Sequence, residues 1–134
     1  MGTWGIGVFE NDTACDFAGD VAEGGDVASL ETALDHVLAI GGGYLEASDA
    51  AEALAAADIV ARLSGNSGEQ TAYTASIDEW VESQKSPPPQ QLREKARRCV
   101  TRILTEPSEM LELWQDTDEF DAWKRSVEAV LARL

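Results

Sequence analysis

The sequence predicts an all-α protein, a compact bundle of five to seven helices in a single domain that spans residues 1–134. Apolar residues recur at helical spacing in most of the segments between breaks. Gly and Pro supply those breaks at 24–25, 41–43, 87–89 and 107. A chain of 134 residues that is 44% hydrophobic buries about two-thirds of its unfolded surface when it folds as one domain.

The first expected element is an irregular N-terminal lead rich in Gly, Trp and Phe. Glycines at positions 2, 5 and 7 alternate with Trp4, Ile6 and Phe9. Glycine permits positive φ, and large apolar side chains anchor the backbone to a core. We therefore expect a pinned segment in which Gly5 and Gly7 adopt conformations that a Cβ opposes.

A helix follows, with Asn11 or Asp12 as its N-cap and an end near Glu23. Asp12, Asp16 and Asp20 share its polar face, and like charges four residues apart repel by a few tenths of a kcal/mol. Water, or an Arg or Lys partner, is favoured over a divalent cation there, because hard cations prefer ligands that converge from several segments. The pattern therefore predicts no metal site.

The second helix is expected from an Asp26 cap to about Ile40, where three glycines end it. His36 is the one histidine of the chain, and at 100° per residue it lies opposite the apolar face. We expect an ordinary surface imidazole rather than a catalytic base or a metal ligand.

The third helix is expected from Ser48 or Asp49 to Leu63, and it is apolar nearly all round, so it belongs in the centre of the bundle. Its polar edge carries Asp58 and Arg62 four residues apart. Two interpretations of Arg62 stay open. It forms a local pair with Asp58, or its guanidinium also reaches Glu10, Asp12 or another carboxylate of the opening motif.

The second half of the chain begins with a surface loop at 64–76, followed by a short helix with Ile77, Trp80 and Val81 directed inward. Three prolines at 87–89 predict a stiff joint. The fifth helix pairs an apolar stripe with the one basic cluster, which consists of Arg93, Lys95, Arg97, Arg98 and Arg102. Neutralisation of the acidic half is favoured for this cluster over a solvated face or an anionic ligand.

Two more helices complete the expected bundle. Pro107 begins a short one that contains Trp114, and Asp116 or Asp118 caps the last one. Phe120 and Trp123 then recur at helical spacing with the aliphatic residues that follow them. We interpret these aromatic residues as core packing rather than as a ligand box.

Three blocks resemble one family. The opening GTWGIGVFENDTACDF, the segment YLEASDAAEALAAADIVA at 44–61 and SEMLELW at 108–114 are similar to the signatures of a bacterial family catalogued as domain of unknown function 4259. The resemblance implies a compact, mainly helical bacterial protein. It implies no activity and names no catalytic residue.

Composition excludes several classes of function. Residues 1–84 hold sixteen carboxylates against Arg62 alone, and this field disfavours nucleic acid and anionic lipid while favouring basic partners. No apolar run is long enough to span a membrane and no signal peptide is visible, so a cytoplasmic protein is expected. Cys15 and Cys99 are too few and too far apart for a zinc site or a disulfide framework.

Three functions remain open. The favoured one is a non-enzymatic module of inhibitory, immunity or regulatory type that binds a basic protein, without a cofactor. The alternatives are a metal-dependent hydrolase or other enzyme that uses N-terminal carboxylates, and a nucleic-acid mimic. The candidate cluster, functional or structural, consists of Trp4, Glu10, Asn11, Asp12, Asp16 and Arg62.

Overall fold

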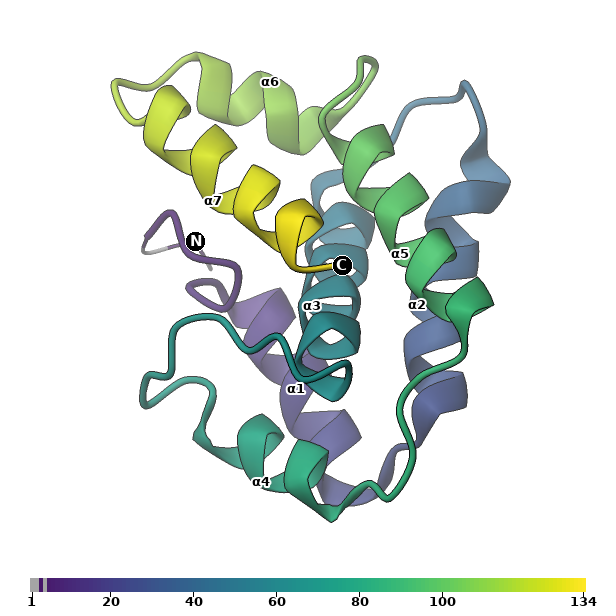
Figure 1. Cartoon of the computed structure of the whole chain (residues 1–134). Helices are drawn as coiled ribbons and strands as arrows, with labels where there is room; N and C mark the ends of the chain where they lie inside the picture. The colour runs from purple at the N-terminus through teal and green to yellow at the C-terminus, as the bar shows by residue number, and fades with distance from the viewer. Residues whose placement is uncertain (1–2, 4) are drawn as a thin grey trace.

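A computed structural model describes residue 3 and residues 5–134, so Gly2 and Trp4 of the predicted lead lie outside the described residues. Across the described residues the chain forms seven helices and no strand, which confirms the all-α prediction (Figure 1). The helices are α1 (Asp12–Gly24), α2 (Val27–Ile40), α3 (Ala47–Leu63), α4 (Ala75–Ser83), α5 (Gln90–Ile103), α6 (Glu109–Gln115) and α7 (Phe120–Arg133).

Helix α3 lies at the centre of the bundle, as its composition predicts. It packs against each of the other six helices (Figure 1). Every residue from Ala53 to Arg62 is buried, and the small alanine side chains let neighbouring helices approach closely. The helix begins at Ala47, slightly before the expected start, because the Glu109 carboxylate of α6 accepts a hydrogen bond from the Ala47 N–H at 2.8 Å.

The first two helices begin at side-chain caps. Asn11 is the N-cap of α1, and its side-chain oxygen accepts from the Ala14 N–H at 2.8 Å. Asp26 caps α2 through a capping box with Ser29. His36 is exposed on α2, with Nδ1 3.9 Å from the carboxylate of Asp49. The expected caps and the surface position of the histidine are therefore confirmed.

The expected cap of the last helix is wrong. Helix α7 begins after Glu119, which forms no side-chain cap, because the preceding residues form a turn in which the Thr117 N–H bonds the Trp114 carbonyl. The aromatic residues pack as predicted, with Trp114 stacked on the buried Trp123 at a centroid distance of 6.0 Å.

Two connections meet beside α5. The Leu45 N–H donates to the Pro107 carbonyl, and the Glu109 N–H donates to the Leu45 carbonyl at 2.8 Å. Arg102 of α5 binds both connections through its guanidinium, which donates to the carbonyl oxygens of Gly41, Gly43, Thr105 and Pro107 at 2.6–3.0 Å. One side chain thereby satisfies backbone acceptors of two loops.

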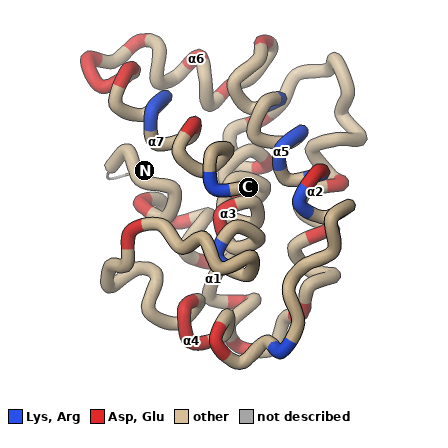
Figure 2. The backbone as a smooth tube through the Cα atoms, viewed as in Figure 1, with Lys and Arg blue, Asp and Glu red and all other residues tan. Residues whose placement is uncertain are grey.

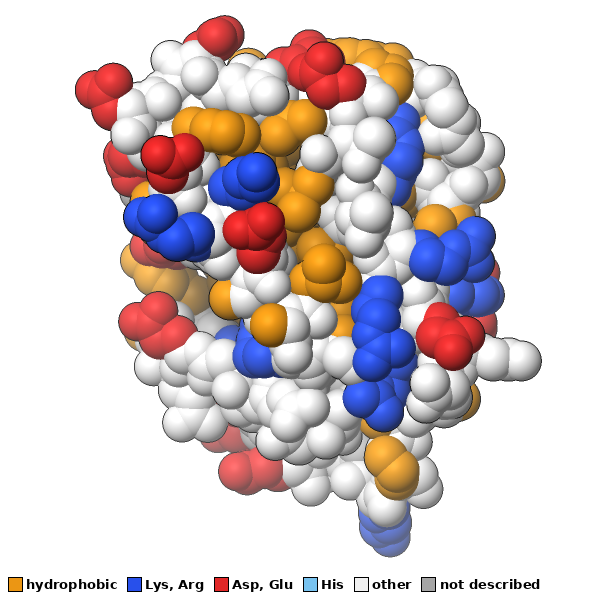
Figure 3. Space-filling view, turned by 45° about the horizontal axis from the view of Figure 1, so that its top comes forward, with side chains coloured by type: hydrophobic (Ala, Val, Ile, Leu, Met, Phe, Trp, Pro, Cys, Tyr) orange, Lys and Arg blue, Asp and Glu red, His pale blue; other side chains and the backbone are white. Residues whose placement is uncertain are grey.

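The basic cluster of α5 neutralises less of the acidic half than expected. Among the described residues, Lys95 is the one member of this cluster that pairs with acidic side chains, those of Glu31 and Asp35 on α2 at 2.8 and 2.9 Å. Arg93 and Arg97 both donate to the carbonyl oxygen of Leu134. The α5 and α7 side of the molecule carries most of the Lys and Arg side chains, interspersed with acidic and hydrophobic ones (Figure 3). The charged positions of α1 and α4, by contrast, are all acidic (Figure 2).

Candidate functional site

Arg62, near the C-terminal end of α3, is the centre of a buried charge network. Its Nε donates to Asp58 Oδ1 at 2.6 Å, and its Nη1 donates to Asp78 Oδ1 of α4 at 2.8 Å. The remaining nitrogen, Nη2, donates to the Glu69 carbonyl at 2.9 Å. The side chains of Arg62 and Asp58 are 2% and 4% exposed, so these charges are removed from water and depend on one another.

Arg133 of α7 completes this network. Its Nη2 donates to Asp58 Oδ2 at 2.5 Å, so both Asp58 oxygens face a guanidinium. Burial acts to lower the pKa of Arg62, but Asp58 and Asp78 outweigh burial and raise that pKa above its ordinary value. We call these four residues, Asp58, Arg62, Asp78 and Arg133, the charge network. Their side chains are charged, and their ion pairs link α3, α4 and α7.

The structure corrects the expected partners of Arg62 in the opening motif. Neither Glu10 nor Asp12 bonds to it, because Asp12 lies on the exposed side of α1 and the Glu10 carboxylate accepts from the Gly7 N–H at 2.9 Å. The lead instead meets Arg62 through an aromatic ring, with the guanidinium carbon 5.6 Å from the Phe9 centroid. The second carboxylate comes from α4, which the loop after α3 carries back towards Arg62.

The expectation about Gly5 and Gly7 is also wrong in its cause. Within the described residues, positive φ occurs at Gly41 and Gly65. A Cβ at Gly5 or Gly7 would instead lie 2.6 or 2.7 Å from the Glu10 carboxyl group. Glycine is therefore needed at both positions because the Glu10 side chain folds back and occupies the space that a Cβ would take.

A hollow of about 280 Å³ lies over the charge network, and Glu10 and Arg62 both line it. Asp12 and Asp16 do not line it, so the structure does not bring the candidate carboxylates together around Arg62. Within the part of the chain that the structure describes, no three His, Cys, Asp or Glu side chains are grouped to hold a metal ion.

The six carboxylates of α1 and α4 outside that network form what we call the α1–α4 acidic face. They are all exposed, on two helices that pack together and contain no Lys or Arg, and none pairs with a cation among the described residues. The face consists of Asp12, Asp16, Asp20, Glu23, Glu79 and Glu82.

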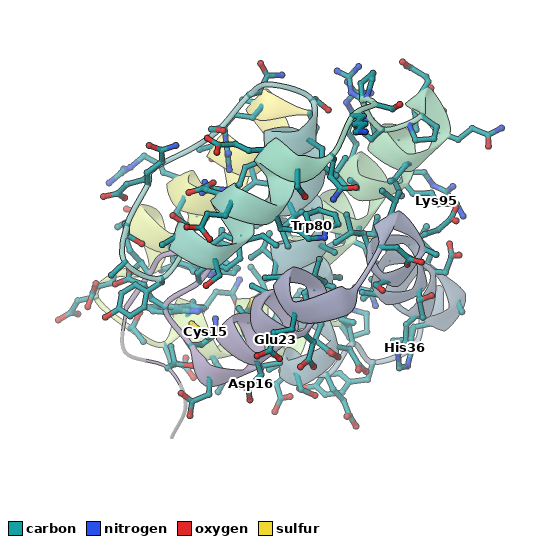
Figure 4. The ribbon with its side chains drawn as sticks, turned by 90° about the horizontal axis from the view of Figure 1, so that it is seen from below. Cys15, Asp16, Glu23, His36, Trp80 and Lys95 are labelled. Atoms are coloured by element: carbon teal, nitrogen blue, oxygen red, sulfur yellow. The ribbon has the colours of Figure 1, made fainter. Side chains whose placement is uncertain are left out.

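A second hollow, of about 380 Å³, opens in this acidic face between α1 and α4, and we call it the Trp80 hollow. Gly19, Ala22 and Glu23 line it from α1, whereas Glu79 and Trp80 are among the lining residues of α4. Figure 4 looks onto this side and shows Trp80 between the two helices, with Glu23 on α1.

Trp80 is 8% exposed, yet its indole N–H donates to no acceptor among the described residues. In the part of the chain that the structure describes, the fully enclosed side-chain atoms that lack a hydrogen-bond partner are Arg93 Nε and Ser108 Oγ. The Trp80 nitrogen is not among them, so it is in contact with solvent. Sequence periodicity predicts that Trp80 points inward, but it gives no signal for the hollow or for the free donor. Asp78 and Arg133 likewise have no sequence signal that links them to Arg62.

Both cysteines are free and protonated near neutral pH. Cys15 is half-buried on α1 and donates from Sγ to the Phe9 carbonyl at 2.9 Å, and burial together with Asp12 and Asp16 raises its pKa. Cys99 is fully buried, which raises its pKa to about 12. Neither thiol has the lowered pKa of a catalytic nucleophile.

Comparisons with known proteins identify one relationship. A family model described as "Domain of unknown function (DUF4259)" matches residues 2–126, from the lead into α7. Searches of curated proteins and of solved structures gave no match. None of the helices in the described part of the chain combines the length and the hydropathy that a transmembrane segment needs.

Proposed function

Because this chain belongs to the DUF4259 family, which carries no assigned activity, we propose from its own structure that it is a non-enzymatic module that binds a basic protein. The binding surface is the α1–α4 acidic face. In this proposal the charge network around Arg62 is structural, since both Asp58 oxygens and three Arg62 nitrogens already have partners.

The observation that carries the proposal is that two adjacent acidic helices, α1 and α4, contain no Lys or Arg. Lys95 neutralises Glu31 and Asp35 on α2, and guanidinium groups neutralise Asp58 and Asp78. The α1–α4 acidic face receives no cation from the described chain. A basic partner would relieve the repulsion along α1 and would be attracted at long range by the unbalanced field.

Such a module fits an inhibitory, immunity or regulatory role, in which affinity for another protein is the whole activity. A bacterial cytoplasm is the setting we propose. The two free thiols support it, because a reducing compartment keeps cysteines unpaired.

A capture experiment with two matched variants tests this proposal. The face variant carries Asp16→Asn, Asp20→Asn and Glu79→Gln, and the control variant carries Asp116→Asn, Asp118→Asn and Glu119→Gln at the corner between α6 and α7. All six side chains are exposed, and both variants gain three charge units. We expect a basic protein from the source organism to bind the wild type and the control but not the face variant. Equal capture by all three proteins would contradict the proposal.

A further inference from the structure

We infer that the Trp80 hollow holds one Lys or Arg side chain of the basic partner, together with a main-chain carbonyl beside it. This inference rests on the proposed function and names the part of the acidic face that recognises the partner. Three features support it: the charge of the hollow, its apolar lining, and the indole N–H of the lining residue Trp80, which has no acceptor among the described residues.

The charge comes from both helices. Glu23 lines the hollow from α1 and Glu79 lines it from α4, and both are exposed and lack an ion-pair partner among the described residues. A cationic group between them would meet a carboxylate from each helix, which neither helix could supply alone. Charge-assisted hydrogen bonds of this type are roughly twice as strong as neutral ones.

The lining suits the stem of a long basic side chain. Gly19 and Ala22 on α1 present little side-chain bulk, and the indole of Trp80 supplies a flat apolar surface between the helices. Lys and Arg bury their methylene groups against such surfaces while the charged head stays near water and carboxylates. A small inorganic cation would leave this apolar lining unused.

The free donor distinguishes a peptide from other cations. The Trp80 N–H reaches solvent without an acceptor among the described residues, and a bound ligand that covers it must offer an oxygen or leave the donor unsatisfied. A peptide offers its main-chain carbonyl next to the basic side chain. Polyamines and metal ions carry positive charge but no acceptor, so they could meet the carboxylates but would leave the indole N–H without a partner.

Nuclear magnetic resonance can test the assignment on the full chain. The probes are the capped peptides acetyl-Gly-Gly-Arg-Gly-Gly-amide and its Lys counterpart, with the Gln counterpart and spermidine as controls. The reporter is the indole N–H signal of Trp80, which the spectrum of Trp80→Phe identifies. We expect this signal to move with the Arg and Lys peptides and to stay in place with the Gln peptide and with spermidine.

Two glycines of α1 provide matched variants. Gly19 lines the hollow and Gly24 lies outside it, and a Cβ at either position meets no atom within 4 Å. Gly19→Leu should fill the hollow and weaken peptide binding at least tenfold, whereas Gly24→Leu should leave binding unchanged. Trp80→Phe, measured through the backbone amides of α1 and α4, should weaken binding about threefold to tenfold through loss of one hydrogen bond.

The outcomes separate this inference from the proposed function. If the peptides shift the backbone amides of α1 and α4 but leave the Trp80 indole signal in place, the hollow is not the recognition site while the acidic face still binds. An equal response to spermidine would overturn the assignment to a peptide. Unchanged affinity of Gly19→Leu would overturn the hollow itself, and the capture by the face and control variants would still decide the proposed function.

Discussion

The carboxylates of the charge network and those of the α1–α4 acidic face contrast sharply, although some are neighbours in the sequence. Asp78 is bonded to Arg62 and to the Thr74 hydroxyl, whereas Glu79, the next residue, is exposed and has no ion-pair partner in the part of the chain that the structure describes. Asp58 is almost completely buried between two guanidinium groups. One set of acidic groups holds helices together and the other faces solvent.

This contrast explains how a chain with a net charge of −15 remains folded while keeping an unbalanced surface. Cations are few, and three of them serve the interior: Arg62 and Arg133 bond the buried Asp58, and Arg102 bonds backbone carbonyls. Removing one partner of a buried pair leaves a charge without compensation, whereas exposed carboxylates stay hydrated. The stability of the fold and the potential of the surface therefore depend on different acidic residues, and mutations should separate the two.

Arg62→Ala should have the largest effect. It leaves Asp78 without a cationic partner and removes one of the two guanidinium groups from the buried Asp58, and we expect a loss of about 3–5 kcal/mol in the free energy of unfolding, measured by urea denaturation. Adding Asp78→Asn should recover part of the loss because it removes one stranded charge. Arg98→Ala, on the exposed side of α5, is the control with little expected effect. A loss below about 1 kcal/mol for Arg62→Ala would mean that the network contributes no more to stability than an ordinary surface ion pair.

Arg133→Ala should have an intermediate effect. Its side chain is 20% exposed, and Asp58 keeps Arg62 as a partner when Arg133 is removed. We expect a loss of about 1–2 kcal/mol, near the value of one hydrogen bond to a charged group. The same urea experiment measures it, and a loss equal to that of Arg62→Ala would show that α7 contributes as much to the network as α3.

Gly7→Ala should have a smaller effect on stability. It acts on Glu10, whose carboxylate belongs neither to the buried charge network nor to the α1–α4 acidic face. A Cβ at Gly7 would displace the Glu10 carboxylate from the Gly7 N–H. We expect a loss of about 1 kcal/mol, the value of one net hydrogen bond. The same substitution in a Glu10→Ala background should cost clearly less in thermal or urea denaturation. Equal costs in both backgrounds would mean that the backbone, not Glu10, requires the glycine.

The smallest effect on stability is expected from the face variant, Asp16→Asn with Asp20→Asn and Glu79→Gln. These groups are exposed and bond to no described cation, so the free energy of unfolding should stay within about 0.5 kcal/mol of the wild-type value. Any gain should shrink as salt is added, because screening removes the repulsion that the variant relieves. A large destabilisation would show that the acidic face has a structural role.

Much of the fold could be predicted from the sequence because helical periodicity and caps are local signals. The apolar composition of residues 50–63 predicts the central helix, and Asn11 and Asp26 predict the starts of α1 and α2 correctly. The start of α7 was not predictable in this way, since Asp116 and Asp118 are both ordinary cap residues and a turn displaces the helix start to Phe120. Local sequence signals therefore predict that a helix exists more reliably than they predict the residue at which it begins or ends.

Less of the candidate site could be predicted, because its contacts join distant segments. Asp58 and Arg62 are one helical turn apart and their pairing is local. The contacts to Asp78 and Arg133 depend on how α4 and α7 pack against α3, and no spacing rule encodes that packing. The glycines of the lead show a related limit, since their sequence suggests unusual dihedral angles, whereas the cause is the space taken by Glu10. The prediction for Trp4 lies outside the described residues.

The Arg102 guanidinium has a consequence for local unfolding. It binds carbonyl oxygens in the connection before α3 and in the connection before α6, and the hydrogen bonds of Leu45 join the same two segments. Neither loop can move away without breaking bonds to the other, so the two should open as one cooperative unit in native-state hydrogen exchange. The Leu45 and Glu109 amides, 64 positions apart in the chain, should then exchange with a shared opening free energy and lose their protection together when Arg102 is replaced.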